Sequence, residues 1–279
     1  MKTDRALIFG ASGQDGSYLS KLLLEKGYEV FAVTRAVTHD FDVPFNHKKL
    51  GLAGVHYLTG DPQDFRSVVS CIDESRPSEI YNLAGQSSVS LSYKIPSQTF
   101  ESISQATINL LEGVRLTDKS IKFYNASSSE CFGDVGDPVD ETSRFSPRSP
   151  YAVAKAAAHW TVSLYRESFG MFACNGILFN HESPLRPKHF VTKKIVLGAV
   201  EASLGRREKT VLGNLDITRD WGYAPEYVEG MWRMLQAPSP SDYVLCTGQS
   251  HTLRDFVALV YESLGLDWRG FVVSNDQQF

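Results

Sequence analysis

The chain has 279 residues, of which 42% are hydrophobic and 22% charged, a balance typical of a folded globular protein. Its formal net charge of -4, without a dense lysine or arginine run, argues against a nucleic-acid or anionic-membrane partner. The four cysteines are scattered and not at metal-ligand spacing, which predicts reduced thiols and no metal site. A strand-like run at the N-terminus and the lack of any apolar stretch near the ~20 residues of a membrane span lead us to expect a cytoplasmic protein.

The first predicted elements form a strand–helix–strand unit. Residues 5–9 predict a buried strand, 17–26 a helix and 29–34 a second strand. The turn between the first strand and the helix contains Gly10, Gly13, Gln14, Asp15 and Gly16. Glycines at such a turn let the backbone approach a pyrophosphate, which then lies at the helix N-terminus. The unit therefore predicts dinucleotide binding.

Arg35 follows the second strand, where dinucleotide-binding folds contact a ribose. An acidic residue at this place would hold the 2′-hydroxyl of NAD, whereas an arginine suits the 2′-phosphate, so we predict NADP. Asp40 and Asp42 lie further on and could serve a ribose. Residues 36–46 have no clear period and predict a loop.

Strands and helices continue to alternate through the first half. Strands are predicted at 55–59, 79–83 and 121–125, with helices at 65–72 and from 97 to 114. Small or polar residues follow these strands: Asp61 after the third, Ala84, Gly85, Gln86 and Ser87 after Leu83 ends the fourth, and Ser128 and Glu130 after the fifth. The alternation predicts an α/β fold with a doubly wound parallel Rossmann sheet and a site at the carboxyl ends of its strands.

A predicted helix carries Tyr151 and Lys155 one turn apart on one face. Ser149 suits the N-cap of this helix and Pro150 its first position. A nearby ammonium lowers the pKa of a phenol from its usual value of about 10, so the pair can take a proton from a sugar or alcohol hydroxyl. We expect Tyr151 to reach the sheet edge that bears Glu130.

In the second half the sequence predicts strands at 172–179 and 242–246 and helices at 190–204, 226–235 and 253–264. Asn180 and His181 end a strand, and Arg186, Lys193 and Arg219 provide cations for an anionic ligand. We expect a nucleotide-binding domain over residues 1–180 and a substrate-binding lobe over 181–279, with partial interleaving.

Gly10-x-x-Gly13-x-x-Gly16 together with Tyr151-x-x-x-Lys155 resembles the extended short-chain dehydrogenase/reductase superfamily. Within it, the segments 13–19, 81–84, 147–151, 176–184 and 219–222 resemble the GDP-mannose 4,6-dehydratase family, and the likeness runs from about residue 5 to 265.

The resemblance implies a lyase that uses NADP to convert GDP-D-mannose to GDP-4-keto-6-deoxy-D-mannose, as a homodimer or homotetramer. It implies that Tyr151 takes the proton of the sugar 4-hydroxyl, Lys155 tunes Tyr151, and Glu130 removes the C5 proton and helps the 6-hydroxyl leave. Ser128 stands where the family usually has threonine. The implied substrate contacts are Ser128, Glu130, Asn180, Lys193 and Arg219, and the implied cofactor contacts are Gly10, Gly13, Gln14, Asp15, Gly16, Arg35, Asp61, the segment from Leu83 to Ser87, Tyr151, Lys155, His181 and Arg186.

The chain departs from the family pattern at several places. Arg35-Ala36-Val37 replaces the Arg-Arg-Ser usual in the family, whose loop takes part in a subunit contact, and this change argues against the tetramer. Gly85 replaces a usual alanine, and Cys131-Phe132 replaces a usual pair of an aliphatic residue and tyrosine. Family members continue past the position of Phe279 with segments that finish the nucleotide pocket, so we expect this chain to be truncated or to lack them.

Three other functions remain open from sequence. The first is dehydration of a related GDP-sugar such as GDP-manno-heptose, which Ser128 and the Cys131-Phe132 pair allow. The second is an epimerase or 4-reductase, against which Glu130 argues because those reactions need no base at C5. The third is a non-catalytic NADP sensor, which has no need of Tyr151, Lys155 and Glu130 together.

Overall fold

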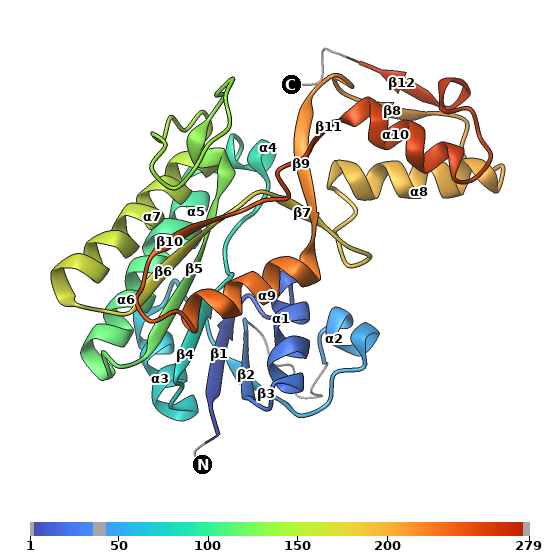
Figure 1. The fold of residues 1–279 in the computed structure, drawn as a ribbon. Coiled ribbons are helices and arrows are strands. Elements are labelled where there is room, and N and C mark those ends of the chain that lie inside the picture. Colours follow the sequence, from blue (N-terminus) through green and yellow to red (C-terminus); the bar gives the residue numbers. More distant parts are fainter. Residues whose placement is uncertain (1–2, 36–42, 276–279) are drawn as a thin grey trace. The chain divides into compact units, whose positions relative to one another are not determined.

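The computed structural model describes residues 3–35 and 43–275 and divides into two compact units (Figure 1). The first unit comprises residues 1–179 with 224–245, and the second comprises 180–223 with 246–279. The single boundary expected near residue 180 therefore does not describe residues 224–245, which return to the first unit. They do so because a helix, α9 (Ala224–Leu235), packs on α1 (Gln14–Glu25), and the strand after it extends the central sheet.

The first unit is built on a seven-stranded sheet in the order β10-β6-β5-β4-β1-β2-β3. All of its strand pairs are parallel, which confirms the predicted doubly wound sheet. The strand order reverses between β1 and β4, the switch point where such sheets bind ligands. The strands are β1 (Arg5–Phe9), β2 (Glu29–Thr34), β3 (Val55–Thr59), β4 (Glu79–Asn82), β5 (Lys122–Ser128), β6 (Ala173–Leu178) and β10 (Asp242–Leu245).

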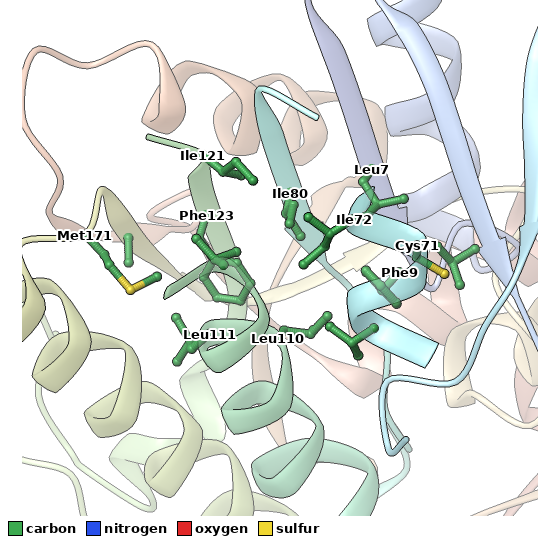
Figure 2. Close-up of a cluster of buried hydrophobic side chains, with 14 of the residues drawn as sticks. Leu7, Phe9, Cys71, Ile72, Ile80, Leu110, Leu111, Ile121, Phe123 and Met171 are labelled. Atoms are coloured by element: carbon green, nitrogen blue, oxygen red, sulfur yellow. The ribbon is translucent and has the colours of Figure 1, made fainter. Parts of the chain in front are cut away.

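Helices cover both faces of this sheet because successive strand residues point to opposite sides. Leu7 and Phe9 of β1 face α3 (Phe65–Ser75), α6 (Ala106–Thr117) and α7 (Pro150–Phe169), and Figure 2 shows their cluster with Ile80 and Phe123. Ala6 and Ile8 face the opposite cluster, to which α1 and α9 contribute.

The shorter helical elements of the first unit differ from the sequence prediction. The helix expected from residue 97 begins as α5 (Pro96–Phe100), passes through the π-helical η1 (Glu101–Gln105) and continues as α6. The loop expected over 36–46 contains the start of α2 (Phe45–Leu50), while Asp40 and Asp42 lie outside the described residues. The unit also contains α4 (Val89–Ser92) and the 3-10 turn η2 (Ser129–Phe132).

The second unit has a core of its own, formed between α8 (Val191–Ser203) and α10 (Leu253–Glu262) with Ile195, Ala199, Val257 and Tyr261 buried. A three-stranded sheet has the order β11-β9-β7, from β11 (Ser250–Thr252), β9 (Thr218–Tyr223) and β7 (Asn180–Glu182). Two further strands, β8 (Thr210–Leu212) and β12 (Val272–Ser274), pair in parallel, and η3 (Trp268–Gly270) precedes β12.

Across the described part of the chain, every helix is too short or too polar to cross a membrane.

Candidate active site

The glycine turn joins β1 to α1 and is shaped by close backbone contacts. Gly10 has a φ of +85°, and a Cβ atom there would lie 2.6 Å from the carbonyl carbon and oxygen of Leu83. A Cβ on Gly16 would lie 2.4 Å from the carbonyl oxygen of Gly10. Gly13 is the N-cap of α1 and makes no side-chain cap, and Gln14 Nε2 donates to Asp15 Oδ1 at 3.0 Å in the first turn. The turn thus places its first residue against the exit of β4, and Ser12 and Gly13 are exposed.

The exit of β4 is the second predicted cofactor segment, and it lies beside the glycine turn. The Leu83 amide donates to the Phe9 carbonyl at 2.9 Å, and Gly85 has a φ of +129°. That conformation favours glycine at this position. Gln86 Nε2 donates to the Ser88 carbonyl at 2.8 Å and to Thr99 Oγ1 at 3.3 Å, so the segment is bonded to α5.

Arg35 and Asp61 follow neighbouring strands, β2 and β3. Arg35 is exposed directly after β2, next to residues outside the described range. Asp61 is half-buried, its amide donates to Ser67 Oγ at 2.9 Å, and its carboxylate accepts the Gln63 amide at 2.9 Å. The Asp61 carboxylate is therefore held by the turn that starts α3, at the predicted sheet edge.

Ser128 and Glu130 lie at the carboxyl end of β5. Ser128 is buried and its Oγ accepts the Glu130 amide at 3.3 Å, which starts the 3-10 turn η2. The Glu130 side chain is half-buried. One short turn thus fixes a hydroxyl and a carboxylate two residues apart at the sheet edge.

The predicted start of α7 is confirmed. Ser149 Oγ accepts the Ala152 amide at 3.0 Å, Pro150 is the first residue, and Gly170 ends the helix in the left-handed conformation. Tyr151 and Lys155 face inward, with 8% and 9% of their surfaces exposed. Lys155 Nζ lies 5.9 Å from the Tyr151 ring centroid and donates to the Ala126 carbonyl of β5 at 2.7 Å. This hydrogen bond joins the helix face that carries Tyr151 and Lys155 to β5, the strand that ends in Ser128.

The electrostatics of Lys155 follow from this burial. Burial lowers the pKa of the Lys155 ammonium to about 8, against smaller upward contributions from Cys131 and Asp15. Burial also raises the pKa of the Cys131 thiol to about 11, so that thiol stays protonated near neutral pH. Lys155 is therefore a cation near neutral pH that loses its charge more readily than an exposed lysine.

The other five predicted residues belong to the second unit. Asn180 and His181 are on β7, where Asn180 pairs with Trp221 of β9, and His181 is buried. Arg219 is an exposed residue of β9. Arg186 makes an ion pair with Glu182 at 3.1 Å, and Lys193 Nζ donates to the Pro184 carbonyl at 2.9 Å.

His159 is a site neighbour that the sequence reasoning did not single out. It lies one turn after Lys155, and its Nδ1 is 3.2 Å from Oγ of Ser127, the residue before Ser128. Its Nε2 lies 3.5 Å from Asp242 Oδ2, and burial lowers the pKa of the ring. The sequence could have indicated His159 through its position four residues after Lys155, which places both side chains on the same face of the helix.

Two residues of α2, Asn46 and His47, also touch the glycine turn and were not predicted. Asn46 Nδ2 donates to the Ser12 carbonyl at 2.9 Å, and His47 Nε2 lies 2.8 Å from the Ala11 carbonyl. Local sequence spacing could not predict these contacts, because they join residues 34 and 36 positions apart in the chain.

Comparison with known proteins gives a match over nearly the whole chain. The family model described as GDP-mannose 4,6 dehydratase matches residues 7–278. The chain is 44% identical to GDP-mannose 4,6 dehydratase 1 of Arabidopsis thaliana, over 98% of this chain and 78% of that protein. It is 45% identical to the GDP-mannose 4,6 dehydratase of Homo sapiens, over 95% of this chain and 74% of the human protein.

Solved structures share the fold. The chain is similar to the UDP-glucose 4-epimerase of Thermus thermophilus in complex with NAD, with a TM-score of 0.82 and 26% identity over 98% of this chain and 87% of that one. A double mutant of DesIV, a dTDP-glucose 4,6-dehydratase from Streptomyces venezuelae, gives a TM-score of 0.86 at 20% identity, over 98% of this chain and 85% of that one. The second likeness shows a common fold.

Proposed function

The chain belongs to the GDP-mannose 4,6 dehydratase family, and on that premise we propose that it removes water from GDP-D-mannose to give GDP-4-keto-6-deoxy-D-mannose. One observation carries the proposal beyond the family match. The Tyr151–Lys155 face of α7 is bonded to β5, the strand whose end bears both Ser128 and Glu130. A phenol–ammonium pair suits removal of a hydroxyl proton, and a carboxylate beside it suits a second proton transfer.

The glycine turn fits a dinucleotide, and we assign it the diphosphate. Side chains at Gly10 and Gly16 would meet backbone atoms, and Gly13 places no side chain over the start of α1. Such a helix N-terminus attracts an anion through its amides and dipole. Further contacts would come from Asp61, the segment from Leu83 to Ser87, Lys155, His181 and Arg186.

NADP is the preferred form of the cofactor. Arg35 stands exposed after β2, where a guanidinium can bind a 2′-phosphate. The related T. thermophilus epimerase is in complex with NAD, which supports a nicotinamide dinucleotide in general. When bound, the nicotinamide supplies a hydride acceptor for C4 and a hydride donor for C6, so it is regenerated in each turnover.

The protein's own groups carry the proton transfers. Tyr151 takes the proton of the sugar 4-hydroxyl, and the Lys155 ammonium favours its phenolate. Ser128 donates a hydrogen bond to the 4-oxygen. The resulting 4-ketone acidifies the C5 hydrogen, Glu130 accepts that proton, and Glu130 then donates a proton to the departing 6-hydroxyl, which leaves as water. One carboxyl group can serve both steps because it returns to its ionised form. The proton that Tyr151 took is returned to C5 when C6 is reduced, so the Tyr151 phenolate is restored.

The second unit supplies the proposed nucleotide-sugar contacts. Asn180, Lys193 and Arg219 offer an amide and two cations, which suit the hydroxyls and diphosphate of a GDP-sugar. A related GDP-sugar such as GDP-manno-heptose is the second candidate, because buried Ser128 lacks the methyl group of the threonine usual in the family and leaves more room at the 4-oxygen.

We also propose a homo-oligomer, dimer or tetramer. The outer face of α7 exposes apolar residues at intervals of four and three, namely Val153, Ala157, Trp160 and Leu164. Trp160 is 60% exposed and Leu164 is 55% exposed. A contiguous apolar stripe of this kind on a helix is typical of a protein contact surface.

Glu130→Gln tests the assignment of the elimination step. The amide cannot accept the C5 proton, so in a single turnover with GDP-mannose the bound cofactor should become reduced while product formation falls by about 10²–10⁴-fold. Absorbance of the reduced nicotinamide and mass spectrometry of the sugar nucleotide measure the two steps. Glu101→Gln, at an exposed position, is the matched control and should behave as wild type. Unchanged formation of the dehydrated product by Glu130→Gln would remove Glu130 from the role of C5 base.

A further inference from the structure

Two side chains of the short helix α2 form hydrogen bonds to backbone carbonyls of the glycine turn. Between Gly10 and Gly13 stand Ala11 and Ser12, and the carbonyl of each is bound by α2. Asn46 Nδ2 donates to the Ser12 carbonyl at 2.9 Å, and His47 Nε2 lies 2.8 Å from the Ala11 carbonyl. Within the turn, the Gly13 amide donates to the Gly10 carbonyl at 3.1 Å.

The protonation state of His47 follows from its partners. A carbonyl oxygen only accepts hydrogen bonds, so Nε2 must carry the proton that is donated to Ala11. Burial lowers the pKa of His47, although the hydrogen bond to Ala11 opposes this effect, so the ring is neutral and Nδ1 is an acceptor. The Tyr57 hydroxyl of β3, 2.9 Å from Nδ1, is then the donor. The His47 side chain therefore links β3 to the glycine turn in one fixed tautomer.

These bonds orient the peptide planes that a diphosphate would meet. Each peptide unit is planar, so fixing the carbonyls of Ala11 and Ser12 also fixes the amides of Ser12 and Gly13. A turn rich in glycine has more backbone freedom to lose on binding than one built from other residues. His47 is fully buried, so water does not replace its bond to Ala11. Binding is favoured when this ordering is already complete in the free protein.

We propose that Asn46 and His47 are positioning residues that pre-order the glycine turn for the diphosphate of a nicotinamide dinucleotide. This inference rests on the proposed function, which assigns the diphosphate to that turn. Neither residue needs to touch the ligand, because each acts through a backbone carbonyl of the turn.

The test uses the full chain with four variants. Asn46→Ala removes a half-exposed donor with little risk to the fold, and His47→Phe keeps a ring but loses both nitrogens. His47→Gln retains an amide donor and should recover part of the function. His56→Phe makes the same change at an exposed histidine of β3 and is the matched control.

Two readouts separate positioning from general stability. The dissociation constant of NADPH, titrated by fluorescence, should rise roughly fivefold to tenfold in Asn46→Ala and His47→Phe, as expected for the loss of one hydrogen bond. Hydrogen exchange of cofactor-free protein should become faster in a peptide covering residues 10–16, while α7 exchanges as in wild type. The turnover number at saturating NADP and GDP-mannose should change less than the dissociation constant.

Several results would overturn the inference. Wild-type NADPH affinity and wild-type exchange of residues 10–16 in Asn46→Ala and His47→Phe would contradict it, and Asn46→Ala alone decides if His47→Phe does not fold. A wild-type protein that binds no NADPH would refute the cofactor assignment of the proposed function, whereas the exchange experiment on cofactor-free protein would still decide whether α2 orders the turn.

Discussion

At the scale of single residues, Lys155 is the group whose properties depend most on its surroundings. Its ammonium is buried against β5, where it donates to the Ala126 carbonyl at 2.7 Å. Burial brings its pKa down from 10.5 to about 8. A lysine kept charged in a buried place opposes folding, so we infer that its position beside Tyr151 serves the proposed proton transfer rather than stability.

Lys155→Met is predicted to separate stability from activity. Below about pH 8 only the folded chain bears the penalty of the buried charge, and between about pH 8 and 10.5 the folded chain has released a proton that the unfolded chain still holds. Wild-type free energy of unfolding should therefore rise with pH across that interval. Lys155→Met should remove this rise and increase the free energy of unfolding at pH 7 by up to about 3 kcal/mol.

The same variant should lose activity by about 10²-fold or more, because Tyr151 loses the cation that favours its phenolate. Urea unfolding of cofactor-free protein at pH 7 and above pH 8, together with turnover of GDP-mannose, measures both effects. A variant less stable than wild type at pH 7 would contradict this account of Lys155.

At the scale of elements, a line of polar side chains crosses the sheet beneath the site. Asn82, Asn125 and Asn175 are register partners on β4, β5 and β6, and amide hydrogen bonds of 3.1 Å and 2.9 Å join them in turn. Asn175 Nδ2 then donates to Asp242 Oδ1 of β10 at 3.0 Å. Because buried polar groups need their partners, this line fixes the register of the strand that ends in Ser128.

Arg166 of α7 binds Asp242, the last residue of this line, and we predict that substituting Arg166 destabilises the fold. Its guanidinium binds both Asp242 carboxylate oxygens, at 2.7 Å and 2.8 Å. Burial raises the pKa of Asp242, but the hydrogen bonds from Arg166 and the neighbouring charges outweigh this and hold the pKa below its usual value. Arg166→Met should lower the free energy of unfolding by about 3–5 kcal/mol near neutral pH, since it leaves a largely buried carboxylate unpaired.

The comparison variant is Arg233→Met, which breaks an ion pair with Glu229 whose arginine side chain is 72% exposed and should lose at most about 1 kcal/mol. The loss in Arg166→Met should shrink as the pH falls and Asp242 becomes protonated. If urea unfolding gave equal losses of unfolding free energy in the two variants, the Arg166–Asp242 pair would contribute no more to stability than the exposed pair.

The predictability of elements follows from how local their signals are. The start of α7 could be predicted because Ser149 and Pro150 are adjacent in sequence and act on the same turn. By contrast, α2 has six residues, too few to show a helical period, and its N-cap Pro44 makes no side-chain cap. The asparagine line could not be predicted, because its members meet only through strand pairing.

At the scale of the whole molecule, the sequence predicted the parallel sheet and the position of the candidate site residues after its strands, but not which segment of the chain returns to the first unit. The glycine turn, Asp61, Gly85 and Glu130 do follow the carboxyl ends of β1, β3, β4 and β5. Partial interleaving was expected, but not that α9 is the helix that returns to the first unit, because α8 and α9 are both amphipathic and their patterns do not say which surface each covers.

Leu164→Glu tests the proposed oligomer. A carboxylate in the middle of the apolar stripe on α7 should disfavour self-association, so light scattering coupled to gel filtration should show a smaller assembly than wild type. Leu259→Glu places the same charge at a 67% exposed leucine of α10 and should leave the mass unchanged. A monomeric wild-type protein would refute the oligomer, and an unchanged mass in Leu164→Glu would move the interface away from α7.

The most direct test of the dehydratase assignment follows one hydrogen atom through the reaction. Purified protein should convert GDP-mannose deuterated at C4 to a product lighter by one water, with the deuterium at C6 and no net change in the cofactor. Mass spectrometry and NMR of the product report both features. A sugar nucleotide of unchanged mass, or a product whose deuterium has passed to the cofactor pool, would contradict the assignment.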